Sequence, residues 1–166
     1  MVLVIGYGNL LRGDDGIGQI LANGLGERIQ HPSVKFVACH QLTPELAEPI
    51  SRAATVIFID AYEGEEAGFL TSYEVTPTNE SGAFTHQSTP ASLLAAARSL
   101  YGQSPRSMMV CVEGETFDFG DALSQSMELK LPGLLKTLEQ VIDLQISIET
   151  RGGATNGPAI WHDCDD

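Results

Sequence analysis

Basic residues are scarce in this 166-residue chain, in which nine lysines and arginines stand against 22 aspartates and glutamates, a formal net charge of −13. Such an excess of negative charge repels phosphate backbones and anionic membranes, so we expect no nucleic-acid partner. Long apolar runs are also missing, since no stretch of about 18 apolar residues occurs that could span a membrane. The start, MVLVIGYGN, has neither the basic segment nor the cleavage site of a signal peptide. We therefore expect a cytoplasmic protein without a membrane or nucleic-acid partner.

Cysteine is rare as well, and the signatures of some common enzyme classes are missing. Cys39, Cys111 and Cys164 are odd in number and widely spaced, which indicates neither a disulfide framework nor a paired Cys-X-X-Cys zinc site. Cys39 and Cys111 stand in apolar runs, so we expect buried thiols. No Gly-X-Ser-X-Gly and no His-Glu-X-X-His occurs, so the sequence indicates neither a serine hydrolase nor a zincin.

Apolar segments typical of strands and helices alternate along the chain. Continuous apolar runs rich in β-branched residues predict strands that are covered on both faces, as in a parallel sheet. The expected strands are 2–7, 34–42, 54–62, 69–77 and 107–115, and the expected helices are one of about four turns from Asp14 and those at 43–53, 91–102 and 121–145. The strand at 69–77 follows its predecessor too closely for a helical crossover, so we expect it to be antiparallel to its neighbour. The sequence thus predicts an α/β three-layer sandwich, with a mostly parallel five-stranded sheet, one antiparallel strand and helices on both faces.

We expect a single domain over residues 1–145. Its last helix contains Pro132 and Gly133, and we expect it to be bent or broken there. From residue 146 to 166 the apolar periodicity gives way to Gly, Thr and Asn, which predicts an irregular and flexible tail.

The loop after the first strand, GYGNLLRGDDG, allows two interpretations. Gly6 and Gly8 fit the start of a dinucleotide fingerprint, but Leu11 stands where its third glycine belongs. Asp14 and Asp15 would also repel a phosphate at the helix start that should attract it. We interpret Asp14 as the helix N-cap, for which its side chain is suited. Asp15 is then a carboxylate free to face a ligand, and the helix start favours its ionised form.

Two more chemically active side chains stand near the end of an expected strand or ahead of an expected helix. Asp60 comes directly after the apolar run VIFI, and no helix start follows that it could cap. His86 lies in FTHQSTP, ahead of the Ala-rich helix. His40 stands at the end of the second expected strand and could line the same cleft, but we expect an ordinary strand-end role for it. Ligands of α/β sheets bind beyond the carboxyl ends of parallel strands, so we expect Asp15, Asp60 and His86 to meet there. This mixed set suits Zn, Ni, Mn or Fe better than Ca or Mg.

Three segments, IGYGNLLRGDDGIG, VIFIDAYEG and FTHQSTPASLLAAA, resemble the [NiFe]-hydrogenase maturation endopeptidases, and the first is most similar to the subgroup that serves bidirectional, NAD(P)-linked hydrogenases. The resemblance implies an enzyme that removes the C-terminal extension of the hydrogenase large subunit after nickel insertion. It implies that Asp15, Asp60 and His86 are the metal-binding and catalytic residues. The implied metal is nickel supplied by the substrate, or another divalent ion such as zinc, and the implied partner is the large-subunit precursor. We expect a monomer.

The resemblance leaves the chemical step open. The three side chains could bind the substrate's nickel and thereby recognise the substrate, so that a precursor without nickel stays uncut. A metal so placed could also polarise the scissile carbonyl or acidify the attacking water. If an aspartate acts as the base, Asp15 is the first choice. Two rival interpretations are a nickel-binding carrier without peptidase activity and a nucleotide-dependent enzyme that uses Gly6 and Gly8.

Overall fold

The computed structural model describes residues 1–78 and 88–151 of the chain. The strands are β1 (Val2–Tyr7), β2 (Val34–Cys39), β3 (Thr55–Glu63), β4 (Leu70–Glu74) and β5 (Arg106–Gly114). The α-helices are α1 (Ile17–Arg28), α2 (Ala47–Ser51), α3 (Pro90–Tyr101) and α4 (Gln125–Arg151), and the 3₁₀-helices η1 (Gly13–Gly16) and η2 (Pro44–Leu46) directly precede α1 and α2. In these ranges no helix is both long and apolar enough to cross a membrane.

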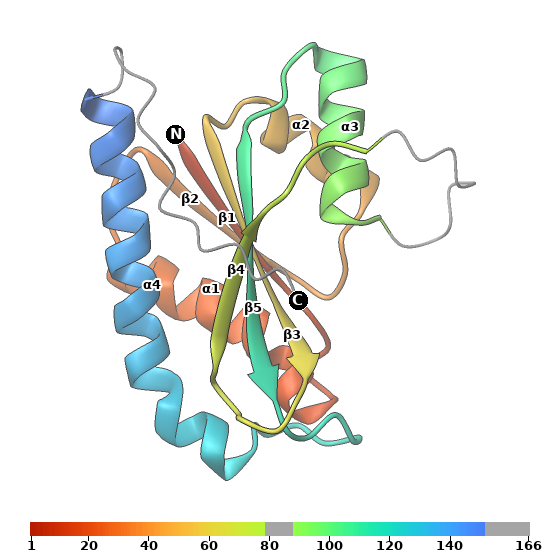
Figure 1. The fold of residues 1–166 in the computed structure, drawn as a ribbon, viewed down its shortest axis with the longest axis vertical. Coiled ribbons are helices and arrows are strands. Elements are labelled where there is room, and N and C mark those ends of the chain that lie inside the picture. The colour runs from red at the N-terminus through yellow and green to blue at the C-terminus, as the bar shows by residue number, and fades with distance from the viewer. Residues whose placement is uncertain (79–87, 152–166) are drawn as a thin grey trace.

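The strands form one mixed, mostly parallel sheet. Their order is β2-β1-β3-β5-β4, with β1, β2, β3 and β5 parallel and β4 antiparallel to β5. The predicted sheet is therefore confirmed, including its single antiparallel strand. The short connection after β3 carries β4 past its predecessor to the far side of β5, so the antiparallel pair is β4 with β5. The four parallel strands end at one edge, the lower edge in Figure 1, and this carboxyl edge is where ligands of α/β sheets bind.

Helices cover both faces of the sheet, as expected (Figure 1). On one face, α1 and α4 bury Leu21, Leu25 and Leu138 against the strands, and on the other α2 and α3 bury Ile50 and Leu94. Because both faces are covered, β1 and the first half of β3 read as unbroken apolar runs. These two cores fix the strands that carry the polar side chains at the carboxyl edge.

The helix α4 differs from its prediction in two ways. It continues as one helix through Pro132 and Gly133, so the break that was one of the two alternatives there does not occur, and it ends at Arg151. Residues 146–151, predicted to be irregular, are therefore helical. Ile146 explains the extension, because it packs against the same core as Ile142 one turn earlier.

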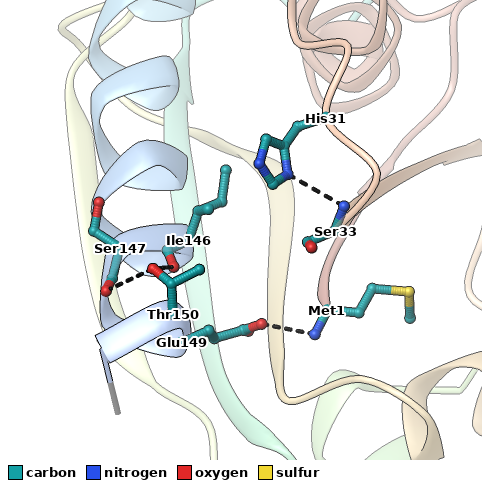
Figure 2. A network of polar contacts seen from close by, with 7 residues as sticks. All are labelled: Met1, His31, Ser33, Ile146, Ser147, Glu149 and Thr150. Atoms are coloured by element: carbon teal, nitrogen blue, oxygen red, sulfur yellow. Dashed lines mark hydrogen bonds and ion pairs between the residues drawn. The ribbon is translucent and has the colours of Figure 1, made fainter.

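The last turns of α4 lie beside the start of β1. Figure 2 shows the Met1 amino group donating to Glu149 Oε2 at 2.6 Å, while Thr150 Oγ1 donates to the Ile146 carbonyl oxygen at 2.9 Å. The ion pair joins two elements that are far apart in the sequence, and the predicted tail beyond Arg151 lies outside the described residues.

Candidate active site

Glycines at the end of β1 and in the turn after it let three backbone segments approach one another closely. Gly8 has a φ of +136°, and a Cβ there would lie 1.9 Å from the Asp15 carbonyl oxygen. A Cβ on Gly6 would lie 1.9 Å from the carbonyl oxygen of Gly18 in α1. Backbone packing thus accounts for the Gly-X-Gly turn without a pyrophosphate, and it brings the Asp15 backbone against the end of β1.

Asp15 lies in η1, immediately before α1, with a half-buried side chain. Its Oδ2 accepts a hydrogen bond from the Asn9 backbone N–H at 3.0 Å. The Asn9 side chain in turn accepts from the Leu11 N–H at 2.9 Å through Oδ1. These bonds fix the loop and orient the carboxylate, which keeps acceptor capacity because a carboxylate has two oxygens.

Asp60 lies within β3 at its carboxyl-terminal part, on the strand next to β1. Its Oδ1 accepts from the Ala61 N–H at 2.9 Å, and the Tyr7 hydroxyl hydrogen-bonds to the carboxylate. Burial raises the pKa of Asp60 to about 6, the two hydrogen bonds oppose this rise, and the negative charge of Asp15 adds to it. The two carboxylates are thus close enough to repel each other, which is the electrostatic situation that a bound cation relieves.

A cavity of about 450 Å³ at the carboxyl edge contains both aspartates. It is lined by Tyr7, Gly8, Asn9, Arg12, Asp15, His40, Gln41, Leu42, Asp60 and Ser88. These residues come from the loop after β1, the loop after β2, β3, and the segment that leads into α3. The structure therefore brings Asp15 and Asp60 together in one cavity, where the sheet topology predicts a ligand.

The third predicted residue, His86, lies outside the described residues. Ser88, two residues further along the chain, lines the cavity. His40, for which an ordinary strand-end role was preferred over lining the cleft, also lines the cavity, as its place just after β2 allowed. Within residues 1–78 and 88–151, no group of three or more His, Cys, Asp and Glu side chains is arranged to hold a metal ion.

Asp14 is not the N-cap that its position suggested. The helix that follows is preceded by η1, and the Asp14 side chain is fully buried. Its Oδ2 accepts from the backbone N–H groups of Glu115 at 3.0 Å and Thr116 at 3.3 Å, and its Oδ1 accepts from that of Ser124 at 2.8 Å. Asp14 thus holds the loop between β5 and α4 against the loop after β1, a role that depends on partners about a hundred residues away.

Tyr7 is a site residue that sequence reasoning missed. Its hydroxyl lies 3.9 Å from Met109 Sδ and also hydrogen-bonds to Asp60. We assign the proton to the Asp60 bond, since a carboxylate is a stronger acceptor than a thioether. Burial, with the Asp60 charge, raises the pKa of Tyr7 far above its usual value, so it stays a donor. Its position at the end of the first strand, directly before the glycine turn, was the available signal.

Both cysteines of the described residues lie near this site. Cys111 pairs with Asp60 in the register of β3 and β5, and Cys39 pairs with Tyr7 in that of β1 and β2. Both side chains are half-buried rather than fully buried. Burial raises the pKa of each thiol, and the Asp60 charge adds to the rise at Cys111. The thiols therefore stay protonated and act as small side chains on the sheet.

The protein is thus an α/β protein with a mixed sheet. It has a polar site beyond the parallel strands, where two carboxylates share a cavity at the carboxyl edge. No protein-family model matches the chain, and no curated protein matches it either.

Solved structures do show the same fold. The [NiFe] hydrogenase maturation protease HycI from Thermococcus kodakarensis KOD1 has a TM-score of 0.69 at 19% identity, covering 86% of this chain and 92% of that one. A hydrogenase 2 maturation peptidase from Thaumarchaeota archaeon SCGC_AB-539-E09 has a TM-score of 0.65 at 22% sequence identity, covering 86% of this chain and 98% of that one. The hydrogenase maturating endopeptidase HybD from E. coli has a TM-score of 0.62 at 23% sequence identity, covering 91% of this chain and 93% of that one. The chain therefore has the fold of these hydrogenase maturation proteases over most of its length.

Proposed function

We propose that this protein is an endopeptidase that removes the C-terminal extension of a [NiFe]-hydrogenase large subunit after nickel insertion, acting as a cytoplasmic monomer. The observation that carries the proposal is the pairing of Asp15 and Asp60 in one cavity of a maturation-protease fold. The sequence similarity of the first loop to the subgroup serving NAD(P)-linked hydrogenases supports that kind of hydrogenase as the source of the substrate.

The substrate's nickel is the ion that these carboxylates would recognise. Two mutually repelling aspartates favour a divalent cation, and an imidazole beside them suits nickel or zinc. We propose His86 as the third ligand. Ser88 supports this, because it lines the cavity and two residues of chain reach at most about 7 Å. A precursor without nickel lacks the recognition handle and stays uncut.

Hydrolysis requires that a water oxygen adds to the scissile carbonyl carbon, that the C–N bond breaks, and that the new amine gains a proton. Asp15 is the first candidate to take the proton from water, because its hydrogen bond from Asn9 orients it in the cavity. The hydroxyl of Tyr7 holds Asp60 in place beside it. The substrate's metal would polarise the carbonyl or the water when bound there.

The test is incubation of a purified, nickel-loaded large-subunit precursor from the same organism with this protein, followed by mass spectrometry. We expect loss of one discrete C-terminal peptide, and no loss from the nickel-free precursor. Asp60→Asn and His86→Ala should abolish cleavage, while Glu27→Gln, an exposed carboxylate on α1, should cleave like the wild type. Transfer of nickel without loss of a peptide would instead establish the carrier, and cleavage by either site variant at the wild-type rate would remove that residue from the site.

A further inference from the structure

Three large apolar side chains are exposed beside the cavity, and we name them the apolar rim: Leu10, Leu11 and Phe119. Their exposed fractions are 45%, 52% and 88%. Leu10 and Leu11 lie in the sequence between Asn9 and Arg12, which both line the cavity. Phe119 comes from the loop between β5 and α4, which lies at the same lower end of the sheet in Figure 1. Exposed apolar side chains grouped at the edge of a polar cavity are typical of a protein-binding surface.

The two loops that carry the rim are bonded to each other. The Gly120 N–H donates to the Leu11 carbonyl oxygen at 2.9 Å, and the Gly13 N–H donates to the Gly120 carbonyl oxygen at 3.1 Å. Arg12 Nε donates to the Phe117 carbonyl oxygen at 3.2 Å. These bonds hold Leu11 and Phe119 side by side before any partner binds, so little conformational entropy is lost on binding.

The buried Asp14 fixes the same pair of loops from below. Its carboxylate accepts the N–H groups at both ends of the loop, those of Glu115 and Thr116 at the start and that of Ser124 at the end. The rim is therefore displayed on a rigid support.

Charge around the rim indicates what kind of partner fits it. Glu115, Asp118 and Asp121 are exposed in the same loop as Phe119, and Arg12 is the basic residue of the loop after β1. A partner that buries an apolar segment here binds more favourably when lysines or arginines flank that segment, because they face the acidic side chains of the loop.

We propose that the apolar rim docks the substrate protein, through an apolar segment flanked by basic residues that lies next to the bond to be cut. This inference rests on the proposed function for the identity of the partner. The rim adjoins the cavity through Asn9 and Arg12, so a segment seated on it continues directly into the site. Docking at the rim holds the scissile segment at the carboxylates and selects precursors by sequence as well as by nickel.

The test measures binding of the same nickel-loaded precursor, immobilised, to the wild type and to matched Leu or Phe variants, with cleavage followed in parallel. Phe119→Ser and Leu11→Ser should each weaken binding about tenfold or more, as central apolar contacts do. Leu100→Ser and Leu129→Ser remove leucines elsewhere that are 71% and 76% exposed, more than Leu11, and should bind within about twofold of the wild type. Asp118→Asn with Asp121→Asn should weaken binding and reduce its dependence on salt.

Every outcome decides the inference. Wild-type binding by Phe119→Ser and Leu11→Ser, or no binding of the precursor to the wild type, overturns it. Equal weakening by the remote controls overturns it as well. Rim-dependent binding without loss of a peptide supports the docking surface and refutes the peptidase, whereas cleavage that is insensitive to the rim variants supports the peptidase and refutes the docking surface.

Discussion

At the residue scale, the Asp60 carboxylate is held in an unfavourable environment. It is half-buried, it faces the negative charge of Asp15, and the hydrogen bonds from Tyr7 and Ala61 offset only part of the cost of ionising it. A group of this kind is poised to bind a cation, because the cation removes the repulsion that the folded protein otherwise sustains.

The raised pKa makes stability depend on pH. The pKa of Asp60 rises from 3.8 to about 6 on folding, so the folded state holds the proton more tightly than the unfolded state. The stabilisation that comes from protonating Asp60 is therefore fully present below pH 3.8 and is lost as the pH rises through about 6. With chelator present, the free energy of unfolding of Asp60→Asn should rise relative to that of the wild type as the pH is raised from about 4 to about 7. The total gain should be about 1–3 kcal/mol. Urea unfolding across that range checks this, with the exposed Asp118→Asn as the control, and a difference that does not vary with pH would contradict it.

Removing the neighbouring Asp14 carboxylate should destabilise the protein, whereas removing the Asp60 charge should stabilise it. Asp14→Ala leaves three part-buried backbone N–H groups without their acceptor, so we expect the free energy of unfolding to fall by about 2–5 kcal/mol. A lost N-cap would instead cost about 0.5–2 kcal/mol. Chemical denaturation measures the loss, and hydrogen exchange should accelerate at Glu115, Thr116 and Ser124. Asp118→Ala is the control in the same loop, and unchanged exchange at the three amides would refute the anchoring role.

At the element scale, α1 packs unusually close to the sheet. A Cβ on Gly18 would lie 2.3 Å from the Tyr7 carbonyl oxygen and 2.5 Å from that of Ile59. Because these are backbone atoms, the helix rather than a flexible side chain would have to move. The distance between α1 and the ends of β1 and β3 sets where Asp15 stands relative to Asp60.

Two glycines in helices provide a matched comparison. Gly18→Ala should lower the free energy of unfolding by about 2–4 kcal/mol, because α1 must shift from the strands. Gly133→Ala in α4 meets nothing within 4 Å, so it should raise stability, by up to about 1 kcal/mol, through helix propensity alone. Thermal and urea unfolding of both variants tests this, and equal effects of the two substitutions would show that the close approach has no energetic consequence.

At the scale of the whole molecule, the net charge of −13 produces repulsion that folding must overcome. Raising the salt concentration from about 0.01 M to about 0.15 M shortens the screening length from about 30 Å to about 8 Å. We expect the Tm to rise by about 2–4 °C, which corresponds to about 1 kcal/mol for a chain of this size. Calorimetry in sodium chloride and in potassium chloride checks this, and a falling Tm in both salts would show that attractive ion pairs outweigh the repulsion.

Across these scales, predictions from local patterns held best. The apolar runs of β1 and β3 and the periodicity of α3 located these elements, and the alternation of elements indicated the mixed sheet. The end of α4 was misplaced because Ile146 was taken as the start of a tail, although Ile142 and Ile146 continue the apolar face. Of the bend or break expected at Pro132, the break does not occur, and the helix continues with one backbone donor fewer on its exposed side.

For the site, chemistry and position along the chain were enough to select Asp15 and Asp60. Asp15 follows one apolar strand and Asp60 ends the apolar run of another, and parallel strands end at one edge, so their convergence in a cavity could be predicted. Tyr7 was missed because an apolar run that ends in an aromatic residue is typical of an ordinary strand. His86 stays a prediction.

By itself the amino-acid sequence determined which segments are strands and helices and which edge of the sheet carries the polar groups, because periodicity and strand direction are local properties. Only the tertiary structure decided what each aspartate does. Asp14 and Asp15 have the same chemistry and adjacent positions, and they differ because a backbone loop about a hundred residues away supplies three donors to one carboxylate, while the other faces a cavity and the charge of Asp60.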